Sequence, residues 1–230
     1  MKTKTQLITG LDVDTREEAL AAVDIAAGCE WFKIGAQLFT RCGPDIVTAV
    51  LGLGKNVFLD LKYHDIPNTV AKASKAAADL GARLFTLHAS GGKAMIAAAR
   101  EAVEGTQAQI LAVTVLTSLT DDMLRTEIGI PETAAQAVPR FAKLAVDAGA
   151  HGIVCSPREI TMVREAIGPD PLIVTPGIRP KWASKDDQAR IMTPRQAAQA
   201  GADMIVVVRP ILKHENPPEA VRMIQEELQG

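Results

Sequence analysis

The sequence predicts a TIM barrel, a closed ring of eight parallel β-strands in which each strand is followed by a helix. Three observations favour this α/β fold. Eight short apolar segments recur along the 230 residues, they read as continuous hydrophobic runs, and Ala-rich stretches with helical spacing separate them. Continuous runs are typical of parallel strands covered on both faces. Eight units in 230 residues give roughly 29 residues each, the size of a compact βα repeat.

The expected elements follow one another at regular intervals. The strands are expected at 6–12, 31–35, 57–62, 83–89, 110–117, 152–156, 172–177 and 203–208. Apolar residues at helical spacing predict helices at 16–28, 70–82, 92–105 and 132–150. Glycines precede several strands, where a left-handed helix stop is common: Gly28, Gly54, Gly81, Gly149 and Gly201.

The domain organisation follows from the absence of any linker-like segment. No Pro/Gly/Ser-rich stretch or charge block divides the sequence, so a single domain of residues 1–230 is expected. A doubly wound open sheet is the alternative, although it usually has fewer strands in this length. The polar segment 179–192 is expected to form either a mobile lid or an ordinary surface loop.

Composition argues against several classes of partner. The formal net charge is −2 and aromatic residues make up only 3%, which disfavours nucleic-acid binding and electrostatic binding to a membrane surface. No apolar run approaches 18 residues, and no secretory signal pattern opens the sequence. Three separated cysteines, Cys29, Cys42 and Cys155, indicate reduced thiols and a cytoplasmic protein. The apolar setting of Cys155 predicts an inert buried thiol.

Charged residues cluster at the end of the third expected strand. Asp60 and Lys62 are two residues apart, so both face the barrel opening while Leu59 and Leu61 lie on the opposite face. Asp65 follows in the turn that opens the next helix. A structural ion pair would explain one Asp-x-Lys pattern by itself.

Other expected strands also carry polar or charged residues at or near their ends. Asp12, His88 and Thr117 end the first, fourth and fifth strands, Lys33 lies in the second, and Arg179 and Arg209 follow the seventh and eighth. Active sites of TIM barrels lie at this carboxyl-terminal end. Because unpaired buried charges are costly, a convergent cluster of acids and lysines favours a catalytic site over scaffolding.

The segment "DLKYHDIPNTV" (60–70) resembles the signature of the orotidine 5′-phosphate decarboxylase family. Further segments match in the family's order over essentially the whole chain: "GLD" (10–12), "FKIG" (32–35), "LHASGG" (87–92), "VTVLTS" (113–118), "TPGIRP" (175–180) and "DQARIMTP" (187–194). As a set these motifs are highly specific.

The resemblance implies conversion of orotidine 5′-monophosphate to uridine 5′-monophosphate and CO₂, without metal or organic cofactor. Lys62 would stabilise the carbanion at C6 and protonate it, within an alternating array of Lys33, Asp60, Lys62 and Asp65. The resemblance also implies a homodimer in which Asp65 and Thr69 reach the neighbouring subunit's site.

The same resemblance implies a set of substrate-binding residues. Asp12 and Lys33 would bind the ribose, Thr117 the pyrimidine, and Arg179, Gln188 and Arg209 the phosphate. One position departs from the family pattern, because Val208 stands where a glycine usually precedes the arginine. Valine can still donate its backbone N–H, provided its branched side chain tolerates the backbone angles required.

Two histidines and a tryptophan accompany these motifs. His64 and His88 have no partner at metal-ligand spacing, so structural roles and no metal site are expected. Trp182 either shields the site or only packs.

Two other functions fit part of the pattern. A metal-dependent aldolase or decarboxylase acting on a sugar phosphate would share Asp60, Lys62 and Asp65. A non-catalytic sensor of nucleotide phosphates is the third possibility, and Val208 makes it slightly more plausible.

Overall fold

The eight strands close into a barrel in which every neighbouring pair is parallel and β8 pairs with β1. The structure, a computed structural model, describes residues 5–183 and 192–229. The strands are β1 (Gln6–Gly10), β2 (Trp31–Gly35), β3 (Asn56–Tyr63), β4 (Leu84–His88), β5 (Gln109–Val113), β6 (Gly152–Val154), β7 (Leu172–Thr175) and β8 (Met204–Val207). The predicted TIM barrel is therefore confirmed.

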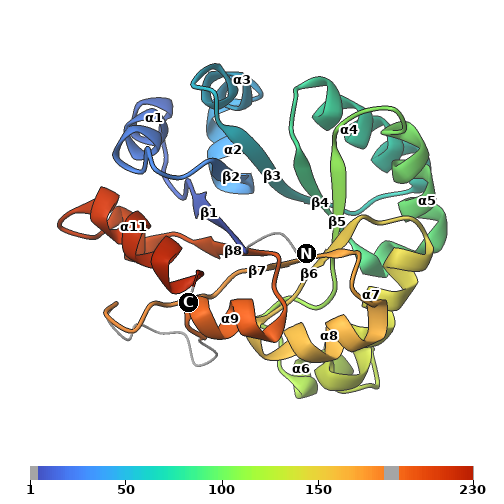
Figure 1. The fold of residues 1–230 in the computed structure, drawn as a ribbon. Coiled ribbons are helices and arrows are strands. Elements are labelled where there is room, and N and C mark those ends of the chain that lie inside the picture. The colour runs from blue at the N-terminus through green and yellow to red at the C-terminus, as the bar shows by residue number, and fades with distance from the viewer. Residues whose placement is uncertain (1–4, 184–191, 230) are drawn as a thin grey trace.

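Helices surround the barrel (Figure 1). They are α1 (Arg16–Ile25), α2 (Ala36–Cys42), α3 (Asp45–Gly52), α4 (Pro67–Asp79), α5 (Gly92–Ala102), α6 (Asp121–Thr126), α7 (Ala134–Asp147), α8 (Ile160–Ile167), α9 (Pro194–Ala200), α10 (Arg209–Leu212) and α11 (Pro217–Glu227). Short 3₁₀ turns, η1 (Ala89–Gly91) and η2 (Pro157–Glu159), follow β4 and β6. Within the part of the chain that the structure describes, no helix has the length and apolarity needed to cross a membrane.

Apolar side chains fill two layers, one on each face of the sheet. The larger layer lies between the strands and the helices and includes Leu59, Phe85 and Ile153. The smaller layer fills the barrel interior with Ile8, Phe58, Leu84, Leu111, Val174, Met204 and Val206. Side chains alternate along each strand, so the next inward positions after this layer lie at the carboxyl-terminal end of the barrel.

Several details differ from the sequence-based expectations, and most are strands that end earlier than predicted, such as β1, β6 and β7. β5 ends at Val113 rather than at residue 117, because its ladder with β6 extends only to the pair Val113–Val154. Gly28 does not have a positive φ, whereas the other four glycines expected to end helices do: Gly54, Gly81, Gly149 and Gly201. The chain leaves α1 through a turn in which the N–H of Cys29 donates to the carbonyl of Ala26 at 2.8 Å.

Candidate active site

A cavity of about 690 Å³ opens at the carboxyl-terminal end of the barrel. The residues that line it include eight of those predicted from the sequence: Asp12, Lys33, Asp60, Lys62, Thr117, Arg179, Val208 and Arg209. Apolar inner residues such as Phe58 and Val206 form its floor. The barrel topology thus brings together side chains that lie almost 200 residues apart in the sequence.

Asp60 lies between two lysines in this cavity. Its Oδ2 is 2.8 Å from Nζ of Lys62 and 3.9 Å from Nζ of Lys33. Nζ of Lys33 also lies 3.1 Å from Oδ1 of Asp12, so acids and lysines alternate. The side chains of Asp60 and Lys33 are only 15% and 14% exposed, which reduces solvent screening and strengthens these pairs. Two ammonium groups are therefore held within reach of any anion that forms there.

Lys62 departs from regular strand geometry. Its φ is +53°, and among residues 5–183 and 192–229 no other non-glycine residue has a positive φ. The β3–β4 pairing shifts register between Leu59 and Tyr63, which frees this stretch from the ladder. Such a conformation at a lysine is unfavourable by about 1–2 kcal/mol and persists only where neighbouring groups hold it.

Thr86 is a contact of this cluster that sequence reasoning missed. Its hydroxyl donates to Oδ1 of Asp60 at 2.9 Å and accepts the backbone N–H of Lys62 at 2.9 Å. Threonine is common in strands, so its type carried no signal. The position of Thr86 did carry a signal. Thr86 lies two residues before His88, so both side chains are on the same face of β4.

Two arginines line the cavity from the chain segments that follow β7 and β8. Arg179 follows β7 and is 6% exposed, and Arg209 begins α10, separated from β8 only by Val208. A guanidinium group can bind phosphate oxygens through two parallel hydrogen bonds, and the loops after strands seven and eight are the usual phosphate site of TIM barrels. This part of the cavity suits a phosphorylated ligand.

Val208 fits its position without a left-handed backbone. Its φ is −124°, and its side chain occupies the space opposite Gly10. A Cβ at Gly10 would lie 2.5 Å from Cγ2 of Val208, so the glycine on β1 accommodates the valine after β8.

Two of the predicted residues do not line the cavity of this chain. Asp65 and Thr69 are exposed in the turn after β3 and in the first turn of α4. Oδ1 of Asp65 accepts the N–H of Ile66 at 2.6 Å. Gln188 and most of the segment 179–192 lie outside the described residues.

His64 and His88 pack against each other, with ring centroids 5.3 Å apart. Burial, followed by the charges of His64 and Lys62, lowers the pKa of His88. Across residues 5–183 and 192–229 there is no group of three or more His, Cys, Asp or Glu side chains arranged to hold a metal ion.

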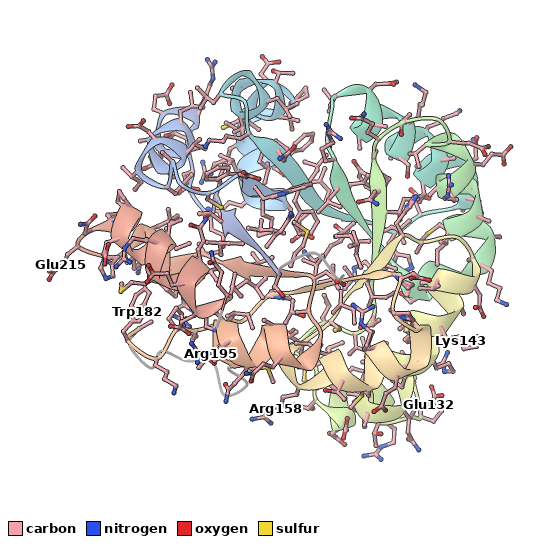
Figure 2. The ribbon with its side chains drawn as sticks, viewed as in Figure 1. Glu132, Lys143, Arg158, Trp182, Arg195 and Glu215 are labelled. Carbon is pink, nitrogen blue, oxygen red and sulfur yellow. The ribbon has the colours of Figure 1, made fainter. Side chains whose placement is uncertain are left out.

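Trp182 packs edge-on against His214, with centroids 5.0 Å apart. Figure 2 shows Trp182 at the side of the molecule near α11. Cys155 is buried, and burial raises the pKa of its thiol. A thiol in this setting stays protonated, as expected for an inert residue.

Comparison with known proteins matches residues 5–224 to the family described as orotidine 5′-phosphate decarboxylase / HUMPS. The chain belongs to this family. Curated relatives named orotidine 5′-phosphate decarboxylase include one from Saccharophagus degradans, 50% identical over 97% of this chain and 94% of the relative. Another, from Geobacter sulfurreducens, is 52% identical over 86% of this chain and 84% of the relative.

A solved member of the family has the same fold. The crystal structure of orotidine 5′-phosphate decarboxylase from Lactobacillus acidophilus has a TM-score of 0.88 and 37% sequence identity, covering 99% of this chain and all of that one. In the family member described here, the matched region spans all eight strands and every described cavity residue.

Proposed function

We propose that this protein is a single-domain enzyme of residues 1–230 that decarboxylates orotidine 5′-monophosphate to uridine 5′-monophosphate and CO₂ in pyrimidine biosynthesis. The observation that supports this most strongly is the Lys33–Asp60–Lys62 array in a cavity that two arginines also line. Curated relatives that match nearly the whole chain carry the name of this decarboxylase.

The substrate would span the cavity from the arginines to the lysines. Arg179 and Arg209, with Gln188 from the segment after β7, would bind the 5′-phosphate. Asp12 and Lys33 would bind the ribose hydroxyls, and Thr117 the pyrimidine. The backbone N–H of Val208 would contribute to the phosphate site. This arrangement sets the pyrimidine carboxylate beside Lys62.

The chemistry requires stabilisation of a carbanion. The bond between C6 and the carboxylate breaks, CO₂ leaves, and the electron pair stays on C6 in the plane of the ring, where the π-system delocalises it poorly. The ammonium of Lys62 stabilises this charge and then donates its proton to C6, and the resulting amine regains a proton from solvent. Because Asp60 and Lys33 hold Lys62 in place before the charge forms, little reorganisation is needed. The proposed reaction uses no metal and no organic cofactor.

The active unit is proposed to be a homodimer. Asp65 and Thr69 belong to the same signature as Lys62, yet both are exposed and neither lines the cavity of its own chain. A second protomer docked at the turn after β3 would supply Asp65 as the last acid of the array and Thr69 as a further contact. The cytoplasm is the proposed location, which agrees with the free thiols of Cys29, Cys42 and Cys155.

A spectroscopic assay tests the proposal. Purified protein is mixed with orotidine 5′-monophosphate, and the loss of the orotate absorbance is followed with and without a metal chelator. The proposed function predicts full turnover under both conditions. Turnover that a chelator abolishes would favour the metal-dependent alternative, and thermal stabilisation by the nucleotide without turnover would favour a sensor.

A further inference from the structure

Thr86 occupies a position on β4 that faces the charged end of β3. Its side chain is fully buried, and it follows Leu84 of the barrel interior by two residues, so both face inward. Thr86 is thus a polar residue directly above the apolar layer of the barrel. Burying a hydroxyl there is costly unless it is hydrogen-bonded.

The hydroxyl of Thr86 makes two hydrogen bonds, and both go to the charge array. It donates to Oδ1 of Asp60, whose Oδ2 contacts Nζ of Lys62 at 2.8 Å. The carboxylate is therefore held through both oxygens, which fixes its plane. A carboxylate held at one oxygen only would rotate and carry the ammonium with it.

The second bond replaces a missing contact of the β-sheet. Leu59 pairs with Phe85, and Tyr63 pairs with Leu87. The three residues of β3 between these pairs, 60–62, therefore lie opposite a single residue of β4, Thr86. Lys62 takes its positive φ within this interval, and its N–H bonds to the Thr86 hydroxyl at 2.9 Å rather than to a ladder carbonyl. One side chain thus satisfies the backbone of Lys62 and orients the acid bound to its amine.

We propose that Thr86 is a positioning residue for the reaction: its hydroxyl fixes the Asp60 carboxylate and the Lys62 backbone together, so that the Lys62 ammonium stays at the reacting carbon. The proposal rests on the proposed function for the identity of the reaction. The positioning itself depends only on the two hydrogen bonds, and can be measured separately from turnover.

Kinetics of Thr86→Val and Thr86→Ser provide the first test. Valine keeps the shape and lacks the hydroxyl, and its kcat is expected to fall roughly ten- to hundredfold with KM changed less than threefold, since a hydrogen bond to a charged group is lost. Serine keeps the hydroxyl and is expected to stay within about fivefold of wild type. Thr9→Val is the matched control, because Thr9 is equally buried but faces the helix layer, and its kcat is expected to be unchanged.

Chemical labelling of Lys62 tests positioning without any turnover. Trace acylation followed by mass spectrometry reports how reactive the Lys62 amine is at each pH. Thr86→Val is expected to raise Lys62 labelling by roughly threefold or more at neutral pH. A carboxylate that is held less firmly favours the protonated, unreactive form of the amine less strongly. Lys143, on α7 at the outer surface (Figure 2), serves as the internal reference in the same sample.

The two measurements separate failure of this proposal from failure of the proposed function. If wild type does not turn over orotidine 5′-monophosphate, the decarboxylase assignment fails while the labelling result still decides the role of Thr86. Equal Lys62 labelling in wild type and Thr86→Val, or equal kcat in the valine and serine variants, would overturn the proposal. If Thr86→Val does not fold, Lys62 labelling is compared between Thr86→Ser and Thr86→Ala instead. Higher labelling in the alanine variant supports positioning, and equal labelling refutes it.

Discussion

Nζ of Lys62 lies 2.8 Å from Oδ2 of Asp60, although the two residues belong to one strand and Lys62 has a left-handed backbone. In a regular strand, residues two apart on the same face point in parallel. The left-handed turn at Lys62, together with the register shift against β4, accompanies a direct contact between the amine and the acid. The irregular backbone at the end of β3 therefore accompanies the ion pair between Asp60 and Lys62.

Asp60→Asn tests the contribution of the central acid. The amide keeps the size of the side chain and removes the negative charge between Lys33 and Lys62, so the two ammonium groups repel each other. We expect kcat/KM to fall by roughly 10²–10³-fold in steady-state assays. Asp147→Asn, which removes the acid of an exposed ion pair with Lys143, should leave activity unchanged and alter unfolding free energy by less than about 1 kcal/mol. Asp60→Asn activity within fivefold of wild type would contradict the proposed array.

Mixed dimers test whether Asp65 acts in the neighbouring site. Lys62→Ala and Asp65→Ala should each be inactive as homodimers. If Asp65 crosses the interface, a hybrid dimer places both substitutions in one site and leaves the other site intact. Unfolding and refolding the two variants together should then restore about one quarter of wild-type activity. No recovery, although hybrid dimers are present by mass spectrometry, would show that Asp65 acts within its own chain.

Gly10→Ala tests the packing of the cavity wall at Val208. The added Cβ would lie 2.5 Å from Cγ2 of Val208 and 3.3 Å from Cε of Lys33, so one of them must move. We expect a loss of about 1–3 kcal/mol in unfolding free energy and a lower kcat/KM.

The double variant Gly10→Ala/Val208→Ala should recover most of both losses, because the shortened side chain makes room. Gly52→Ala is the control, since a Cβ there meets nothing within 4 Å. If the double variant is no better than the single one, the close approach to Val208 does not explain the effect.

Much of the barrel and its cavity was predictable from simple patterns. Continuous apolar runs fix the strands, and alternation along β3 places Asp60 and Lys62 on the inner face, where both line the cavity. The left-handed backbone of Lys62 was not predictable, because it accompanies a contact with Thr86, 24 residues away. The early end of β5 depends likewise on the short β6 beside it.

The pH dependence of stability tests the environment of His151. Nδ1 of His151 accepts the backbone N–H of Ile110 at 3.0 Å, a role that only the neutral ring can fill. Burial, and then the charge of Arg100, lowers the pKa of His151 below its ordinary value of 6.5. Below pH 6.5 the unfolded chain therefore binds more protons than the folded one, so stability falls as pH falls.

Thermal unfolding of wild type and His151→Gln between pH 8 and pH 5 measures this effect. The variant should be less stable at pH 8, and the difference should narrow toward pH 5 as wild type loses the contribution of the neutral ring. Burial also lowers the pKa of His88, so the stability of both proteins changes with pH through His88. The difference between wild type and variant removes this shared contribution and isolates His151. A constant difference across the range would contradict this assignment.

The most direct test of the central claim is the turnover of orotidine 5′-monophosphate by Lys62→Ala, measured beside its affinity for uridine 5′-monophosphate. If the Lys62 ammonium stabilises and protonates the carbanion, kcat should fall by roughly 10⁴-fold or more while nucleotide affinity stays within about tenfold of wild type. A Lys62→Ala enzyme that retains more than about one tenth of wild-type kcat would contradict the account.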